Sequence, residues 1–141
     1  MATRSDFTED EWEALQKGVT GAGMLVSVSD RDFTDAFGEA SALAKALASQ
    51  HAQSESQLVR DLAGMRGTGF GLSASPHEVE TETLAALGTA LATLAVKAPD
   101  ETDAYRQLVL GVANAVAESK GGVAPAETAA LEKIRGALGA A

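Results

Sequence analysis

The fold is decided by two similar stretches of sequence, GMLVSVSDRDFTDAFGEASALAKAL at residues 23–47 and GVANAVAESKGGVAPAETAALEKIR at residues 111–135. The second stretch begins 88 residues after the first. Each is typical of a helical hairpin, in which an acidic turn joins two helices. A unit that occurs twice predicts a helical bundle with internal pseudo-twofold character. At this offset the following residues coincide: Gly23 with Gly111, Asp30 with Glu118, Glu39 with Glu127, Leu43 with Leu131, and Lys45 with Lys133.

Length and composition indicate one all-α domain over residues 1–141. A globular chain of this length buries ~68% of the surface that it exposes when unfolded, which is enough for a single core. The apolar share is 45%, but only 4% of the residues are aromatic, so small side chains allow helices to approach closely. Strand patterns are nearly absent, whereas helical stripes recur along the chain. We therefore expect a single-domain bundle of six or seven helices.

The charge balance argues against two classes of partner. The chain has 20 acidic and 11 basic residues, a net charge of −9, and its Lys and Arg residues are scattered. Such a surface repels nucleic-acid phosphates and anionic membranes. The longest small-apolar stretch, residues 108–117, is shorter than the ~20 residues that span a bilayer. We expect no nucleic-acid binding and no membrane insertion, while a protein partner or a homo-oligomer is compatible with this composition.

Three further features indicate a cytoplasmic protein that is not an enzyme. The absence of Cys excludes disulfides and thiolate chemistry and is typical of a reducing compartment. The first residues, MATRSDFTEDEWE, lack the apolar run of a signal peptide. The only histidines, His51 and His77, lie outside any catalytic or metal-binding motif.

The first helix has a well-defined start signal. Thr8 and Glu11 have the spacing of a capping box, and the flanking Phe7 and Trp12 have that of a hydrophobic staple. We therefore expect a helix to begin at Thr8. Glycines at positions 21 and 23 then predict a kink that divides the helix into two pieces.

The middle of the chain contains three more predicted elements. An apolar stripe from Phe33 to Leu47 predicts the returning helix of the first hairpin. Ser54 and Gln57 have the spacing of another capping box, which predicts a shorter helix. The segment GTGFGLSAS, residues 67–75, predicts a flexible Gly-rich loop.

Proline and acidic residues mark the last three helices. Ser75 and Pro76 predict a helix start, and leucines at helical spacing follow from Leu84 to Leu94. Pro99 and Asp100 end that helix and predict the start of the next, which should run to about Ser119. Glycines at positions 121 and 122 predict a turn. Pro125 is then expected to be the first residue of the last helix.

The best candidates for chemistry are Asp30, Asp32, Asp35 and Glu39, at the turn of the first hairpin and on the helix beyond it. Several carboxylates in such a place can surround a hard cation with oxygen ligands. Their spacing is not that of an EF-hand loop. The alternative is structural, because Asp30 or Asp32 can cap the helix while Asp35 stabilises its dipole. The repeat places Glu118 and Glu127 at the equivalent positions of the second hairpin.

The two hairpins resemble the TerB-like family, named after tellurite-resistance protein B. The resemblance is strongest over VANAVAESKGGVAPAETAALEKIRGAL, residues 112–138. The family pattern is an apolar helix that ends in an acidic residue, a Gly-containing turn, and a helix that opens with Glu before an Ala/Leu-rich stripe. The resemblance implies an all-α bundle, associated with stress or tellurite responses, in which acidic residues hold divalent metal ions. The residues similar to the pattern are Glu118, Gly121, Gly122, Glu127 and Leu131.

The chain departs from that family at both turns. The usual Asp-Gly pair is absent, and Lys120 would oppose a cation in the second turn. The first turn is therefore the favoured site. Our first hypothesis is a non-enzymatic TerB-like protein that binds calcium, magnesium, manganese or zinc weakly there.

Two other hypotheses come from different classes. One is a helical protein–protein interaction module without metal, in which an exposed apolar or acidic face docks a partner, with the 67–75 loop or the face that carries Trp12 as the contact. The other is a small-molecule pocket between helices. Its lining would include Phe33, Phe37, Met24 and Trp12.

Overall fold

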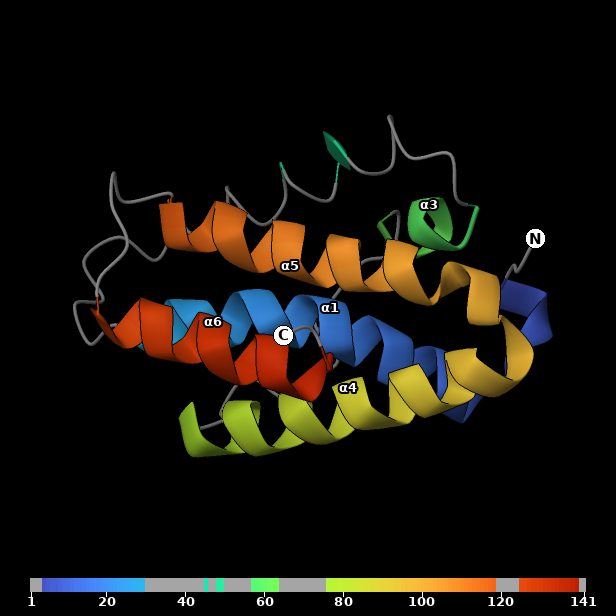
Figure 1. Cartoon of the computed structure of the whole chain (residues 1–141), viewed down its shortest axis with the longest axis horizontal. Helices are drawn as coiled ribbons and strands as arrows, with labels where there is room; N and C mark the ends of the chain where they lie inside the picture. The colour runs from blue at the N-terminus through green and yellow to red at the C-terminus, as the bar shows by residue number, and fades with distance from the viewer. Residues whose placement is uncertain are drawn as a thin grey trace.

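The computed structural model describes residues 4–29, 45, 48–49, 57–63, 76–118 and 125–139. Within these ranges the chain forms helices and no strand, which confirms the all-α class. Two short 3₁₀ helices, η1 and η3, accompany the α-helices (Figure 1). The elements are η1 (Arg4–Asp6), α1 (Glu9–Ser29), α3 (Gln57–Ala63), α4 (Pro76–Lys97), η3 (Pro99–Glu101), α5 (Thr102–Glu118) and α6 (Pro125–Ala137).

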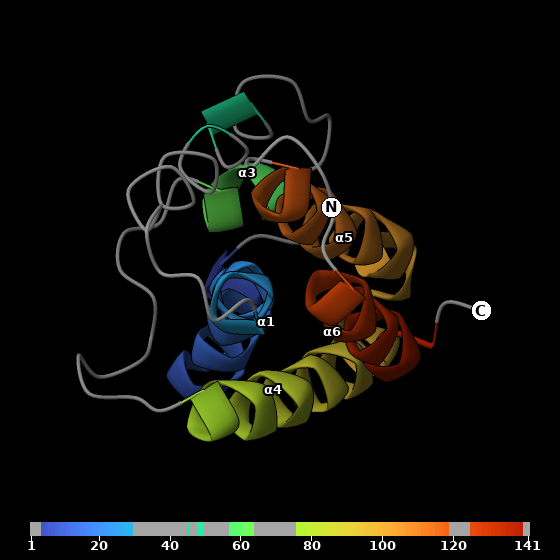
Figure 2. The ribbon, with the colours of Figure 1, turned by 90° about the vertical axis from the view of Figure 1, so that its left-hand side faces the viewer.

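Helix α1 is the centre of the bundle. It packs against α4, α5 and α6 and also contacts α3. Viewed nearly end-on in Figure 2, α1 has α4 below it, α6 to its right, and α5 and α3 above it. Residues 18–23 are all buried, and because an α-helix turns through 100° per residue, this run is covered on every side.

The start of α1 confirms the predicted capping box and staple. The Thr8 amide donates a 2.8 Å hydrogen bond to Glu11 Oε1, and the Glu11 amide donates one of 3.2 Å to Thr8 Oγ1. The rings of Phe7 and Trp12 lie with their centroids 6.0 Å apart. Trp12 is buried at 4% exposure. Local sequence alone therefore fixes where this helix begins.

The predicted division of α1 at Gly21 and Gly23 is wrong, because one helix continues from Glu9 to Ser29. Tight packing accounts for glycine at positions 18 and 21. A Cβ on Gly21 would lie 2.3 Å from Thr83 Oγ1, and one on Gly18 would lie 2.2 Å from Tyr105 Oη. The missing side chains let α4 and α5 approach the backbone of α1 closely.

The later helices begin where the prolines predict, with α4 at Pro76 and α6 at Pro125. The C-terminal end of α6 is closed by Gly139, at φ 67°, whose amide donates a 3.2 Å hydrogen bond to the Gly136 carbonyl. Arg106 Nε on α5 donates a 2.8 Å hydrogen bond to the Leu138 carbonyl just before it. Fully buried residues from these helices include Leu87, Leu94, Leu108, Val112 and Ile134.

Several predictions fall on parts of the chain outside the described residues. Helices α5 and α6 correspond to the two arms predicted for the second hairpin, but most of the returning arm predicted for the first, residues 33–47, is not described. The internal repeat and the count of six or seven helices therefore stay predictions. The same holds for the Gly-rich loop at 67–75.

Among the described residues, one helix is long and apolar enough to cross a membrane by length and composition alone. It is His77–Lys97 of α4, with a mean hydropathy of 1.2 and 33% of its apolar window buried. A core helix of a soluble protein meets the same criterion, so this property alone does not distinguish the two. The absence of membrane insertion stays a prediction.

Candidate functional site

A groove of about 310 Å³ runs between α1 and α4. The two helices are antiparallel, because Lys17 pairs with Glu82 while Glu11 pairs with Lys97. They lie side by side in both ribbon views (Figures 1 and 2). The groove is lined from α1 by Asp10, Glu13, Ala14 and Lys17, and from α4 by Glu82, Ala85, Ala86 and Thr89.

Small side chains leave the space between the two helices open. Ala14, Ala85 and Ala86 supply the apolar part of the lining, and Ala86 is almost fully buried at 7% exposure. Leu or Val at these positions would fill the depression. Glycines 18 and 21, farther along α1, bring the two helices together, so the groove lies over closely packed backbones.

The groove carries more negative than positive charge. Its three carboxylates, Asp10, Glu13 and Glu82, face a single ammonium group, that of Lys17. Lys17 Nζ lies 3.5 Å from Glu82 Oε1, and its side chain is only 19% exposed. Within the part of the chain that the structure describes, no ion pair or hydrogen bond engages the side chains of Asp10 and Glu13. The end of the groove nearest the start of α1 is therefore an uncompensated acidic site.

The carboxylate between these two acids has a different environment. Glu11 Oε1 pairs with Lys97 Nζ, which also donates a 3.3 Å hydrogen bond to the Asp6 carbonyl and lies 5.9 Å from the centre of the Phe7 ring. The hydrogen bond from Lys97, followed by that from the Thr8 amide, lowers the pKa of Glu11 below its usual 4.5. This cluster fastens the start of α1 to the end of α4 and lies outside the groove lining.

The outer face of α4 continues the groove as an uncharged surface. No charged residue lies between Glu82 and Lys97. We call the exposed residues at helical spacing on this face the α4 stripe. Val96 is its most exposed large side chain, at 83%. The α4 stripe consists of Ala85, Gly88, Thr89, Ala92 and Val96, and it shares Ala85 and Thr89 with the groove.

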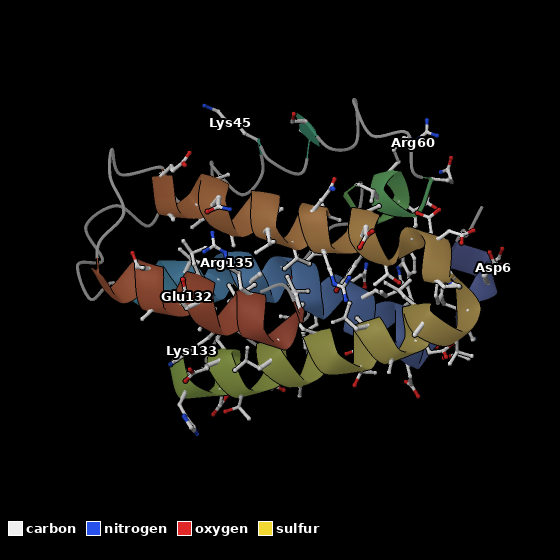
Figure 3. The ribbon with its side chains drawn as sticks, viewed as in Figure 1. Asp6, Lys45, Arg60, Glu132, Lys133 and Arg135 are labelled. Atoms are coloured by element: carbon white, nitrogen blue, oxygen red, sulfur yellow. The ribbon has the colours of Figure 1, made fainter. Side chains whose placement is uncertain are left out.

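Ion pairs fasten the charged ends of α4 to neighbouring helices. Lys133 on α6 pairs with Glu80, and Figure 3 shows Lys133 on the side of α6 that faces α4. Two further pairs join α4 to α1: Glu82 of α4 pairs with Lys17 of α1, and Lys97 of α4 pairs with Glu11 near the start of α1. The basic groups closest to the groove therefore already have acidic partners.

The sequence-predicted metal ligands are not assembled within the described residues. Asp30, Asp32, Asp35 and Glu39 all lie outside them. Glu118 is the exposed last residue of α5, and the backbone of Glu127 lies in α6. No group of three or more Asp, Glu, His or Cys residues in the described ranges is placed to hold a metal ion, and this includes the groove.

The structure also bears on the two alternative sites. Trp12 is part of the core, packed on Phe7, so no exposed face of this fold carries it. Met24 is partly buried against the same core, whereas Phe33 and Phe37 lie outside the described residues. The pocket between helices therefore stays a prediction, because two of its four lining residues are not described.

The acidic groove was absent from the sequence predictions. Asp10, Glu13 and Lys17 follow one another at steps of three and four, which places them on one face of a helix. In a sequence, however, acids in the first turns of a helix are fully accounted for by the helix dipole. The uncharged run after Glu82 was a second signal of this surface. The acidic face of α1 and the uncharged run of α4 come together only when the two helices pack against each other.

No protein-family model, curated protein or solved structure matches this chain. The fold and the groove therefore define its class on their own, as an acidic all-α bundle with an open groove between two antiparallel helices.

Proposed function

We propose that this chain is a non-enzymatic, cytoplasmic helical interaction module that docks another protein through α4. The observation that carries the proposal is the α4 stripe, an exposed and uncharged helix face that runs into the groove. The outer face of a helix in a strongly charged protein normally carries charged side chains, which keep it in water. Contiguous exposed apolar surface is instead typical of interaction sites.

The size of the surface suits a transient contact. The α4 stripe covers three turns of one helix, and its small side chains would allow a partner to approach the backbone closely. An interface centred on one helix and one groove falls at the lower end of specific protein–protein interfaces, which bury about 1,200 Å² or more in total. Val96 would supply the largest apolar contact at one end of it.

Site-specific photo-crosslinking tests this proposal. A photoreactive amino acid replaces Ala92 in the middle of the α4 stripe, and a control replaces Gln107, an exposed residue of α5. After irradiation in the cells that make the protein, we expect a discrete protein adduct from position 92 and none from position 107. An adduct of twice the 14.4 kDa chain mass would identify self-association. No adduct from position 92 would contradict the proposal.

A membrane is the competing explanation for an apolar α4. Vesicles of phosphatidylcholine and phosphatidylglycerol provide the test. We expect the protein to stay in the supernatant when they are sedimented. Co-sedimentation that is abolished by Val96→Lys would instead assign the α4 stripe to a lipid surface.

A second proposal is the TerB-like function, with weak divalent-cation binding at the turn of Asp30, Asp32, Asp35 and Glu39. What supports it is the sequence repeat and its acidic turns. It includes a pseudo-twofold repeat of the hairpins at residues 23–47 and 111–135 within six or seven helices. A role in stress or tellurite responses would follow from the family resemblance. A cation there would be compatible with docking through α4.

A further inference from the structure

We infer that the groove between α1 and α4 receives a basic side chain of the partner protein, an arginine in particular, and that Asp10 and Glu13 are its acceptors. The inference rests on the proposed interaction function and assigns the chemistry of the partner. The juxtaposition that carries it is two carboxylates with no partner among the described residues, at one end of a groove whose lining lysine is already paired.

The geometry of the groove sets which groups a ligand would meet. On α1 the lining extends from Lys17 back to Asp10, and on α4 from Glu82 forward to Thr89. Seven residues of α-helix span about 10 Å, so the groove is two turns long. The Lys17–Glu82 pair occupies one end. Asp10, Glu13 and the Thr89 hydroxyl occupy the rest.

The charges favour a cation at the open end. Asp10 and Glu13 are one turn apart on the same helix face, where like charges repel each other. Lys17 offsets Glu82, which leaves the other two carboxylates without a counter-charge among the described residues. A bound cation would remove this repulsion. The nearby Lys97 does not, because it is held by Glu11 and the Asp6 carbonyl.

The shape and chemistry favour a guanidinium over a metal ion or a free small cation. The carboxylates of the groove are not arranged to hold a metal ion. A guanidinium presents five donors in a planar fork, can bridge two carboxylates, and is weakly hydrated. The alanines of the lining leave room for the aliphatic part of an arginine. The adjoining α4 stripe adds an uncharged surface that a polypeptide can cover and a lone cation cannot.

Fluorescence anisotropy with a labelled peptide tests the inference. The probe is an alanine-rich helical peptide of about 15 residues with two arginines at i and i+4 spacing. Versions with Lys or Gln in place of both arginines accompany it. We expect the chain to bind the Arg peptide, to bind the Lys peptide more weakly, and not to bind the Gln peptide.

Paired variants locate the site. Asp10→Asn with Glu13→Gln removes the two acceptors, and Asp100→Asn with Glu132→Gln removes two exposed carboxylates elsewhere, so both variants keep the same net charge. We expect the groove variant to weaken Arg-peptide binding ~10-fold or more, about the loss of one charge-assisted contact, and the control variant, which lies outside every proposed site, to bind like the wild type. Ala85→Leu, which fills the groove without changing charge, should also weaken binding. Thermal unfolding shows that each variant is folded.

Three results would overturn the inference. They are equal weakening by the two double variants, equal binding of the Arg and Gln peptides, and no binding of the Arg peptide by the wild-type chain. The first would reduce the effect to overall net charge. In each case a protein adduct from position 92 would still support docking through α4, so failure of the groove assignment is separable from failure of the proposed function.

Discussion

The hydroxyl of Tyr105 on α5 donates a 2.8 Å hydrogen bond to the carbonyl oxygen of Leu15 on α1. Both residues are fully buried, and the bond joins positions 90 residues apart in the sequence. Gly18 lies one turn beyond Leu15, and its lack of a side chain makes room for the phenol. Tyr105, Leu15 and Gly18 thus form a close buried contact between α5 and the central helix.

Removal of this hydroxyl should destabilise the bundle moderately. For Tyr105→Phe we expect a loss of about 0.5–1.5 kcal/mol in the free energy of unfolding, the usual net value of one buried hydrogen bond. Urea denaturation measures it. The ring stays in place, so the m-value should not change. An unchanged free energy of unfolding would show that the hydrogen bond from Tyr105 to the Leu15 carbonyl does not stabilise the folded state.

Alkaline pH should unfold the protein as Tyr105 ionises. Burial raises the pKa of this phenol well above its usual 10.0. The folded state therefore holds the proton where the unfolded state releases it, and stability falls as the pH rises above about 10. Tyr105 is the only tyrosine, so phenolate absorbance reports on it alone. We expect the absorbance change to coincide with the loss of helical circular dichroism, and a change that precedes it would contradict the buried phenol.

An alanine at position 18 should destabilise the protein despite its better helix propensity. A Cβ there would lie 2.2 Å from Tyr105 Oη and 2.9 Å from Leu87 Cδ2, so packed groups must move. We expect Gly18→Ala to cost about 1–3 kcal/mol. Gly111→Ala on α5 is the matched control, because nothing lies within 4 Å of its Cβ position.

The control should be stabilised by about 0.5–1 kcal/mol, the propensity difference alone. Combining Gly18→Ala with Tyr105→Phe should recover part of the loss, because the closest clashing atom is then absent. If no stability is recovered, the destabilisation by Gly18→Ala would come from the contact with Leu87 instead of the contact with the phenol.

The Glu11–Lys97 pair should give the chain an acid-sensitive contribution to stability. The pKa of Glu11 is lowered in the folded state, so its contribution is complete above the ordinary value of 4.5 and is lost as the pH falls through the lowered pKa. We expect Glu11→Gln to be less stable than the wild type near neutral pH. The difference should shrink at acid pH.

Urea titrations at several pH values provide the measurement. Lys97→Met removes the same pair from the other side and should reduce the acid dependence in the same way. A difference between wild type and Glu11→Gln that is constant with pH would point to the helix cap alone.

Cation binding at the first acidic turn is testable by calorimetry. Titration with calcium, magnesium, manganese and zinc should give weak binding for at least one ion if Asp30, Asp32, Asp35 and Glu39 are ligands. Asp30→Asn with Asp32→Asn should abolish the signal, whereas Asp10→Asn with Glu13→Gln should leave it unchanged. No heat with any of the four ions would leave these carboxylates as helix caps.

Local signals predict helix ends well, because the groups that determine them are neighbours in sequence. Thr8 and Glu11 bond to each other, Phe7 packs on Trp12, and Pro76 and Pro125 begin helices. All of these contacts join residues no more than five positions apart. They depend on short-range geometry that a sequence displays directly.

The role of the glycines in α1 was not predictable in this way. Gly21 is a helix breaker by propensity, but here it faces Thr83 and makes room for α4. Tertiary packing outweighs the propensity. The groove shows the same dependence, because Glu82 meets Lys17 only once α1 and α4 lie antiparallel.

The central place of α1 has a consequence for how the chain is made. This helix is synthesised before the helices that contact it, which begin at residues 57, 76, 102 and 125. The apolar residues of α1 therefore cannot make their contacts with α4, α5 and α6 until those later helices have been synthesised, and apolar surface exposed in this way makes nascent chains prone to misassociation. A chaperone would therefore meet α1 before it meets α4, α5 or α6.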